Sequence, residues 1–268
     1  MDWEPAHADH SIDSVNLLFT FANPVDSDSF DDLIIPLRKA ASIHKLTNRI
    51  EAQDAPDIAL PTTPGQSVMI NFGTMPTTRR VAFQQVAENA IISEFSIGVG
   101  SCSMMTVRYR RWANFFSELG DLFQAVDSAW PISENVKSIK LQYVDRFISI
   151  PGGASHFEVL AESNPKFLVV PQSDPMAAFH VHTGWFDYDS EQKSRFLTNV
   201  NIDAGDVRQP QFAGAQRNMT FLTLMQSESL GPSLENPLAQ ADILHQRLKG
   251  LFRQLISKAA AARVGLSE

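Results

Sequence analysis

Apolar and polar side chains alternate along many segments of this chain, and such alternation is typical of half-buried β-strands. In the first of these segments, the alternation places Val15, Leu17, Phe19 and Phe21 on one face. From this pattern, or from short apolar runs, we predict strands at residues 14–21, 68–72, 90–99, 103–110, 137–150, 156–160, 166–170 and 218–225. Residues 179–206 are predicted to form two further strands joined by a polar connector.

Three other segments have apolar side chains at intervals of three and four, which predicts amphipathic helices. Residues 29–46 have this spacing, but Pro36 lies inside them and predicts a break. Residues 111–130 have an unusually aromatic apolar stripe. The third segment, residues 237–264, begins with a proline and follows Asn236, which is the expected N-cap.

The order of these elements predicts the fold class. Strands followed by a long amphipathic helix occur twice, and the Pro-Gly-Gly of residues 151–153 is the best internal boundary. We therefore predict an α+β fold with antiparallel sheets in two similar halves, each closed by a long amphipathic helix. Residues 1–150 form the N-terminal α+β half, and residues 151–268 form a β-rich half with the terminal helix. The halves pack closely, as two domains or as one.

The composition is that of a globular protein with a large core. The chain has 268 residues, of which 44% are hydrophobic and 19% are charged. No segment approaches the roughly 18 uninterrupted apolar residues of a membrane span, and the acidic start is unlike a secretory signal. The net charge of −8 argues against a general attraction to nucleic acid or to anionic membranes. We expect no membrane association.

The single cysteine, Cys102, excludes an internal disulfide and favours a reducing compartment, so we predict a cytoplasmic protein. Its neighbours indicate a strand, which favours a buried structural thiol over a nucleophile. The sequence contains no G-x-S-x-G, H-E-x-x-H, P-loop or Cys-His arrangement, which weighs against an enzyme without excluding one.

Residues 179–206 contain the densest cluster of potential ligand side chains. Alternation places His180 and His182 on one face of the first strand, and Asn199, Asn201 and Asp203 on one face of the second. If the strands pair as a hairpin, these groups share a face, where they could bind a partner or ligand. Polar residues are also the normal surface of an open antiparallel sheet.

A metal site is the alternative interpretation of these histidines. The H-x-H spacing directs two imidazoles from one strand face, and His156, Asp187 or Asp203 could supply a third ligand. A divalent metal such as zinc, held by His180, His182 and His156, would support a metal-dependent enzyme that activates water. Otherwise we expect no cofactor.

Two other groups of residues are candidates for a functional or structural role. Asp145 and Arg146 lie in the predicted strand 137–150, and Asp145 is on its apolar face, where a carboxylate must be paired. We interpret Asp145 as a structural anchor rather than a catalytic carboxylate. The second group is Arg108, Arg110, Arg111 and Trp112, which surround Tyr109. These residues could bind a phosphate or a nucleic acid. The simpler interpretation is a solvated start of the predicted helix.

Three patches resemble a sporadically distributed family of uncharacterised bacterial proteins of about 250 residues. That family has a Y-x-x-W-x-x-F helix start, a strand of the type L-R-Y-I-N-R-F, and a C-terminal helix with L-H and a later Phe. The matching residues are Tyr109, Trp112, Phe115, Tyr143, Arg146, Phe147, Leu244, His245 and Phe252. The chain departs at Gln142 and Asp145, where the family has arginine and asparagine. We predict structural roles for Tyr109 and Arg146, as for Asp145.

We therefore predict a non-catalytic binding protein with a protein partner or self-association through sheet edges or the aromatic helix. The sporadic distribution of the resembled family favours a bacterial accessory system such as phage defence or toxin control. The alternatives are the metal-dependent enzyme and a nucleic-acid-binding module that uses the arginines of residues 108–111.

Overall fold

A computed structural model describes residues 2–52, 79–149, 155–161, 174, 176–189, 193–208 and 215–266. The predicted strands 68–72 and 166–170 lie outside the described residues, as does the predicted boundary at residues 151–153. Within the described part of the chain, no helix is both long and apolar enough to cross a membrane.

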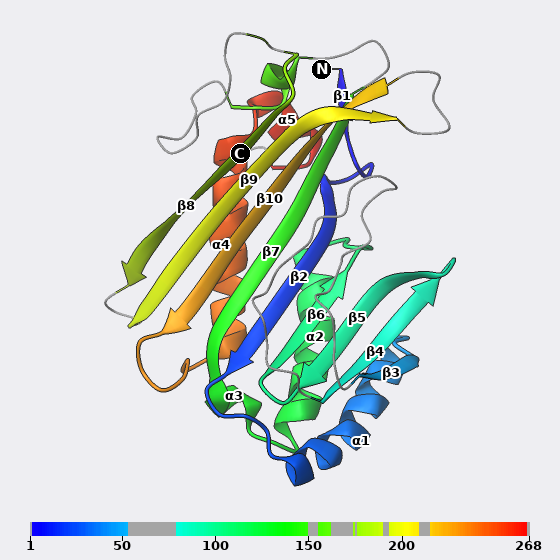
Figure 1. The fold of residues 1–268 in the computed structure, drawn as a ribbon, viewed down its shortest axis with the longest axis vertical. Coiled ribbons are helices and arrows are strands. Elements are labelled where there is room, and N and C mark those ends of the chain that lie inside the picture. The colour runs from blue at the N-terminus through cyan, green and yellow to red at the C-terminus, as the bar shows by residue number, and fades with distance from the viewer. Residues whose placement is uncertain are drawn as a thin grey trace. The chain divides into compact units, whose positions relative to one another are not determined.

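In the described residues, ten strands form one antiparallel sheet (Figure 1). The strand order is β3-β4-β5-β6-β2-β7-β10-β9-β8, and the short strand β1 pairs with β7 beside this path. The strands are β1 (Trp3–Pro5), β2 (Ile12–Phe21), β3 (Asn48–Ala52), β4 (Arg80–Ala87), β5 (Ala90–Gly98), β6 (Ser101–Thr106), β7 (Val136–Ser149), β8 (Phe179–Asp189), β9 (Ser194–Arg208) and β10 (Ala215–Ser229).

The prediction of two similar halves, each with its own sheet closed by a long helix, is wrong. Strand β7, from the predicted first half, lies beside β10, from the predicted second half, so one sheet includes strands of both. Alternation along a strand indicates which side chains are buried, but it does not indicate which strand lies next to it. The repeated order of strands and then helix therefore does not divide the sheet.

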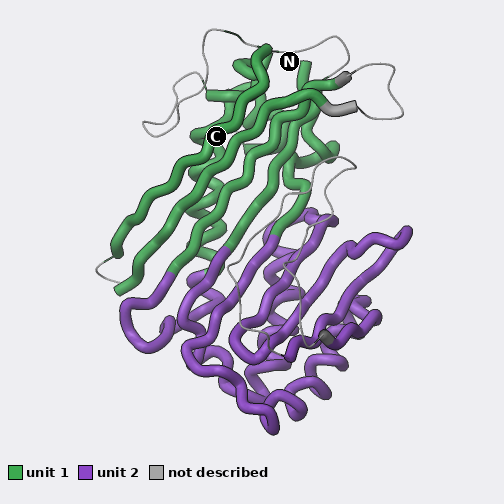
Figure 2. The backbone as a smooth tube through the Cα atoms, viewed as in Figure 1, with its two compact units in different colours: residues 1–15, 141–227, 241–268 green, residues 16–140, 228–240 purple. Residues whose placement is uncertain are grey.

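The chain forms two compact units that interleave in sequence (Figure 2). Unit 1 comprises residues 1–15, 141–227 and 241–268, and unit 2 comprises residues 16–140 and 228–240. Compactness in the folded chain does not test which segments fold independently, so the division at residue 150 stays a prediction.

Unit 2 contains the helices α1 (Ser27–Ile43), α2 (Trp112–Asp127) and α3 (Ile132–Asn135). The aromatic stripe of α2 packs on the sheet, where the rings of Phe19 and Phe123 have centroids 5.1 Å apart. Cys102 on β6 is buried, as predicted. The predicted break at Pro36 is wrong, because α1 continues through this residue. Its ring removes one backbone donor, and the buried stripe of Phe30, Leu33 and Leu37 holds the helix together across that position.

In unit 1, the helix α4 (Pro237–Leu255) lies against one face of the strands. The Phe221 ring on β10 contacts both Phe147 on β7 and Phe252 on α4, with centroids 6.2 and 5.6 Å apart. The predicted helix to residue 264 is interrupted, because the Ser257 hydroxyl accepts a hydrogen bond from the Ala260 N–H and begins a separate helix, α5 (Lys258–Arg263). The predicted cap is confirmed, since the Ala239 N–H donates to the Asn236 side chain over 3.1 Å.

Candidate functional site

Strands β8 and β9 form the hairpin that unites the predicted polar residues. They pair antiparallel without a register shift over all 11 residues of β8. His180 lies opposite Asp203, and His182 lies opposite Asn201. Asn199 lies opposite Gly184. The structure therefore brings these predicted side chains onto one stretch of sheet.

Contacts with α4 determine which face of the hairpin is open. The Arg247 guanidinium of α4 lies 4.0 Å from the centroid of the Phe196 ring and 3.5 Å from the Asp189 carboxylate. Phe196 and Asp189 therefore face α4, and strand alternation directs their neighbours to the opposite side. We call that side the hairpin face; it comprises His180, His182, Gly184, Phe186 and Tyr188 of β8 and Arg195, Leu197, Asn199, Asn201 and Asp203 of β9.

The hairpin face has an acidic end and a basic end. At one end, the Nδ1 of His180 lies 2.6 Å from the Oδ1 of Asp203. At the other end, the Arg195 guanidinium lies 5.3 Å from the centroid of the Phe186 ring, which is a cation–π arrangement. Arg195 is opposite Tyr188 in the register. The His180–Asp203 pair thus lies eight residues along the strands from Tyr188 and Arg195.

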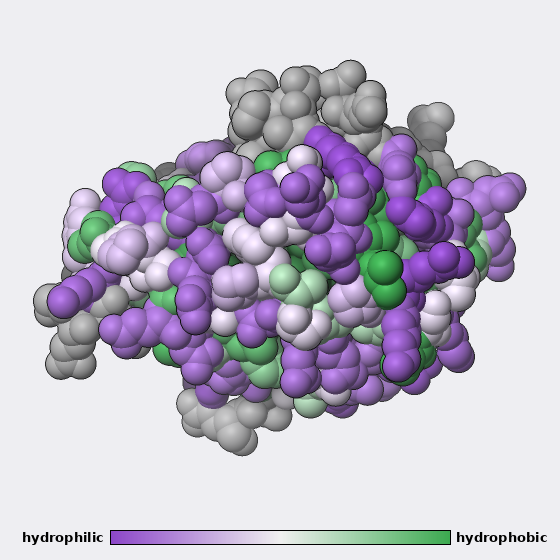
Figure 3. Space-filling view, turned by 90° about the horizontal axis from the view of Figure 1, so that it is seen from below, coloured by the Kyte–Doolittle hydropathy of each residue, from purple (hydrophilic) through white to green (hydrophobic). Residues whose placement is uncertain are grey.

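Two large aromatic side chains on this face are exposed to solvent. Phe186 is 56% exposed and Tyr188 is 70% exposed. Elsewhere, the surface mixes residue types: in the view of Figure 3, hydrophobic residues occur in several separate groups among hydrophilic ones. Adjacent exposed aromatics on a regular strand are typical of a binding surface rather than of ordinary solvent-facing sheet.

Strand β8 is also an edge strand among the described strands, since β9 is the one described strand that pairs with it. In the described part of the chain, β8 and β3 are the two edges of the sheet. Strand β3 has five residues and includes Arg49 and Glu51, so it is short and charged, as edges that avoid pairing usually are. Strand β8 has 11 residues, no lysine and no proline. Of the two edges formed by the described strands, β8 is therefore the one better suited to pairing with another chain.

The structure does not bring His156 to the histidine pair. His156 lies in a 3-10 helix, η1 (His156–Glu158), where a strand at 156–160 was predicted, because the Ser155 side chain caps the turn. Its ring is buried and lies 5.0 Å from the Phe179 ring, centroid to centroid. Phe179 alternates with His180 and faces away from the hairpin face. Among the described residues, no group of three or more His, Cys, Asp or Glu side chains is arranged to hold a metal ion.

Asp145 is buried on β7 and accepts a hydrogen bond from the Ser11 hydroxyl over 2.7 Å. Burial raises the pKa of Asp145 to about 7; the Asp13 carboxylate adds to this increase, and the Ser11 hydrogen bond opposes it. The neighbouring Arg146 guanidinium donates to Asp13 over 2.8 Å. These contacts tie β7 to the start of β2 and to Ser11 just before it.

The arginine group lies at the start of α2. Arg108, Arg110 and Arg111 are exposed, whereas Tyr109 is buried between them. Trp112 is half-buried and stacks on Phe116 of its own helix, with ring centroids 5.3 Å apart. Tyr109 therefore packs into the protein, Trp112 stays partly accessible, and the three arginines face solvent.

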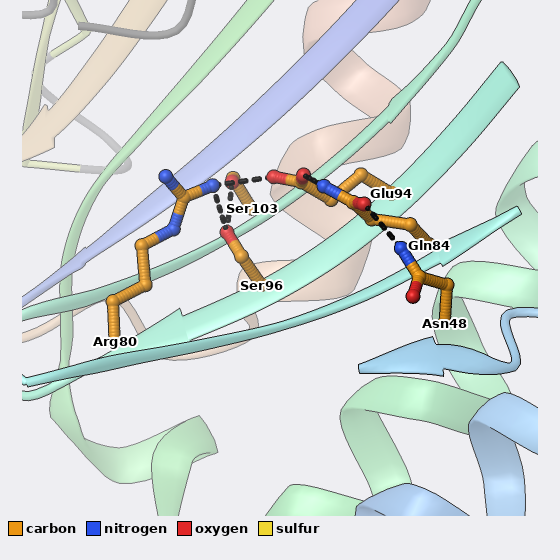
Figure 4. Close-up of polar contacts among 6 residues, drawn as sticks. All are labelled: Asn48, Arg80, Gln84, Glu94, Ser96 and Ser103. Atoms are coloured by element: carbon orange, nitrogen blue, oxygen red, sulfur yellow. Dashed lines mark hydrogen bonds and ion pairs between the residues drawn. The ribbon is translucent and has the colours of Figure 1, made fainter. Parts of the chain in front are cut away.

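A second polar cluster lies on β3 to β6 in unit 2 (Figure 4) and was not predicted. Both carboxylate oxygens of Glu94 accept hydrogen bonds, one from Arg80 and one from the Gln84 side chain at 2.6 Å. Asn48 donates to Gln84 over 3.0 Å, and Arg80 also donates to Ser96 over 2.9 Å. The sequence signal is the pair Gln84 and Glu94, which lie between apolar residues in strands that are mainly apolar. Because these side chains form hydrogen bonds with one another, we interpret the cluster as a structural network.

No protein-family model matches the chain, and no curated protein is similar enough in sequence to be counted as a relative. The resemblance to the sporadically distributed bacterial family stays a prediction.

Proposed function

We propose that this chain is a non-catalytic protein-binding module that binds an extended segment of a protein along β8. The observation that carries the proposal is the edge itself: a regular strand of 11 residues, uninterrupted by lysine or proline, with Phe186 and Tyr188 exposed beside it. Such an edge is a liability unless it is used, because it can pair with any extended chain.

Strand addition provides both affinity and specificity. The unpaired N–H and C=O groups of an edge bind the backbone of an incoming strand, and alternate side chains select its sequence. On the hairpin face, the selecting side chains of β8 are His180, His182, Phe186 and Tyr188. Phe186 and Tyr188 are the expected anchors, because aromatic rings bury a large area while losing few rotatable bonds.

The proposed setting is a bacterial accessory system such as phage defence or toxin control. Its support is the resemblance of residues 106–119, 139–148 and 241–257 to a sporadically distributed bacterial family. The single cysteine supports a cytoplasmic location. Binding through an edge strand needs no catalytic group or cofactor from this chain.

A peptide library tests the proposal without knowledge of the natural partner. Extended peptides of about 11 residues, long enough to cover an edge of that length, are selected on the wild-type chain. Their affinities are then measured by fluorescence anisotropy for wild type, for Phe186→Lys/Tyr188→Lys, and for Ile35→Lys/Ile43→Lys. The last variant is a matched control, because Ile35 and Ile43 on α1 are exposed by 76% and 71%.

We expect the peptides to bind the control as tightly as wild type and the β8 variant at least about tenfold more weakly, because truncating an anchor in a binding surface typically costs 1 to 2 kcal/mol or more. Equal affinity for wild type and the β8 variant contradicts the proposal, as does a library that yields no binder for the monomeric chain.

A further inference from the structure

We infer that the protein bound along β8 is a second copy of this chain, paired antiparallel with β8 across a two-fold axis at Gly184. This inference rests on the proposed function and names its partner. It requires that β8 be complementary to itself in length, in side-chain chemistry and in charge.

The length of β8 suits self-pairing. Phe179 and Asp189 bound the strand, and Gly184 is its central residue. An antiparallel pair centred on Gly184 therefore overlaps all 11 residues of each copy. The other edge, β3, has five residues, so pairing of β8 with β3 of another copy would leave more than half of β8 uncovered.

The side chains on the hairpin face are also self-complementary about Gly184. His182 and Phe186 lie two positions from the centre on opposite sides, and His180 and Tyr188 lie four positions from it. In the two-fold pair, each histidine of one copy therefore lies opposite an aromatic ring of the other. Directly opposite side chains on one face are in contact distance, and histidine and aromatic rings are suitable cross-strand neighbours.

The charges at the two ends of the hairpin face also favour antiparallel pairing. Within one copy, Asp203 is opposite His180, and Arg195 is opposite Tyr188. The two-fold pair places His180 opposite Tyr188 of the second copy, so the acidic end of each hairpin face lies in the same row as the basic end of the other. A parallel arrangement would align acidic end with acidic end. The charges of β9 therefore favour the antiparallel pair.

The centre of the strand permits close approach. A side chain on Gly184 would overlap the Asn199 side chain, which occupies the space above this glycine. In each copy, the Asn199 amide of the same chain thus lies over the centre of β8. The two-fold axis passes through Gly184, which has no side chain. Pairing across this point also places each exposed Phe186 and Tyr188 ring beside a histidine of the other copy, which removes part of its apolar surface from water.

Sedimentation equilibrium measures the association, and circular dichroism verifies that each variant is folded. We expect a dimer for wild type and for Ile35→Lys/Ile43→Lys. In Phe186→Lys/Tyr188→Lys, we expect the dissociation constant to rise at least about 100-fold, since two central aromatic anchors are lost in each copy. A monomeric wild-type chain overturns the inference, as does a dimer that the β8 substitutions leave intact.

A distance between spin labels tests the register. In a Cys102→Ser, Asp187→Cys chain, the label projects from β8 away from the hairpin face. Pairing centred on Gly184 separates the two Asp187 Cα positions by about 21 Å, from a rise of about 3.4 Å per residue and a strand spacing of about 4.8 Å. A distance near 14 or 28 Å indicates an axis one residue away and contradicts the assigned centre. If the chain is monomeric but still binds library peptides at β8, the inference fails while the proposed function stands.

Discussion

Gly184 lies directly opposite Asn199, and the Asn199 amide fills the volume that a side chain on Gly184 would need. A Cβ at residue 184 would also approach the Thr198 carbonyl oxygen to 3.0 Å. We therefore expect Gly184→Ala to destabilise the wild-type chain by about 1 kcal/mol but to have little effect in an Asn199→Ala background, because the overlapping group is then absent. Urea unfolding of the four chains in this cycle gives the coupling.

Gly205 on β9 is the control for that cycle, because a Cβ there meets no atom within 4 Å. Equal effects of Gly184→Ala in both backgrounds would show that Asn199 does not occupy the space above the glycine.

Asp145 is expected to make stability fall as the pH rises. The unfolded chain releases this proton near the ordinary pKa of 3.8, whereas the folded chain keeps it until the raised pKa of about 7. Its favourable contribution is complete below pH 3.8 and is lost as the pH approaches 7. At about 1.4 kcal/mol per pH unit, the interval corresponds to roughly 4 kcal/mol. In Asp145→Asn, which retains an acceptor for Ser11, urea unfolding from pH 4 to 8 should lack this decline; an unchanged pH profile would contradict it.

His245 is expected to make stability rise with pH, which is opposite to the effect of Asp145. Its Nδ1 lies 2.9 Å from the Tyr143 hydroxyl, and burial lowers the pKa of this imidazole from 6.5 to about 4. The folded chain therefore holds His245 neutral, and the stability this provides above pH 6.5 is lost as the pH falls toward 4. In His245→Gln the unfolding free energy should decline more steeply with rising pH than in wild type, because the opposing contribution is removed. A profile parallel to wild type argues against a neutral His245.

The Arg80–Glu94 pair is expected to show strong coupling. Its side chains are 20% and 7% exposed, so a charge that loses its partner stays largely buried. Glu94→Leu alone should cost about 3 kcal/mol or more, because Arg80 and Gln84 lose their acceptor. The double variant Arg80→Met/Glu94→Leu should be more stable than Glu94→Leu. Urea unfolding tests this order, and strictly additive losses would contradict it.

Cys102 is expected to be unreactive in the folded chain. Burial raises the pKa of its thiol, and the reactive thiolate is therefore scarce as well as inaccessible. A thiol reagent such as dithionitrobenzoate should label less than a tenth of the chains at native pH and all of them in denaturant. Rapid labelling of the folded chain would contradict a structural role.

Features contained within one strand or helix end can be predicted from the sequence. Alternation identifies the side chains that share a face, and the β8–β9 register places His180, His182 and Asp203 together accordingly. Asn236 caps α4 because capping depends on the residues next to it in sequence.

Features that depend on spatial neighbours cannot be predicted in this way. The sequence does not indicate that β7 lies beside β10, so the single sheet is missed. The same limit applies to Pro36, whose helix persists because its apolar stripe is buried, and to His156, which the Ser155 cap and the Phe179 ring place on the other side of the sheet. The edge position of β8 likewise follows only from the strand order.

Residue-resolved amide hydrogen exchange tests the protein-binding edge most directly. In the free chain, every second amide of β8 points outward, since an edge strand uses only half of its donors within the sheet. When a library peptide or a second copy is bound, exchange at these alternate amides of Phe179–Asp189 should slow at least about tenfold, while β3 (Asn48–Ala52) is unchanged. Equally fast exchange of the β8 amides in free and bound chains, or protection at β3 instead, contradicts binding along β8.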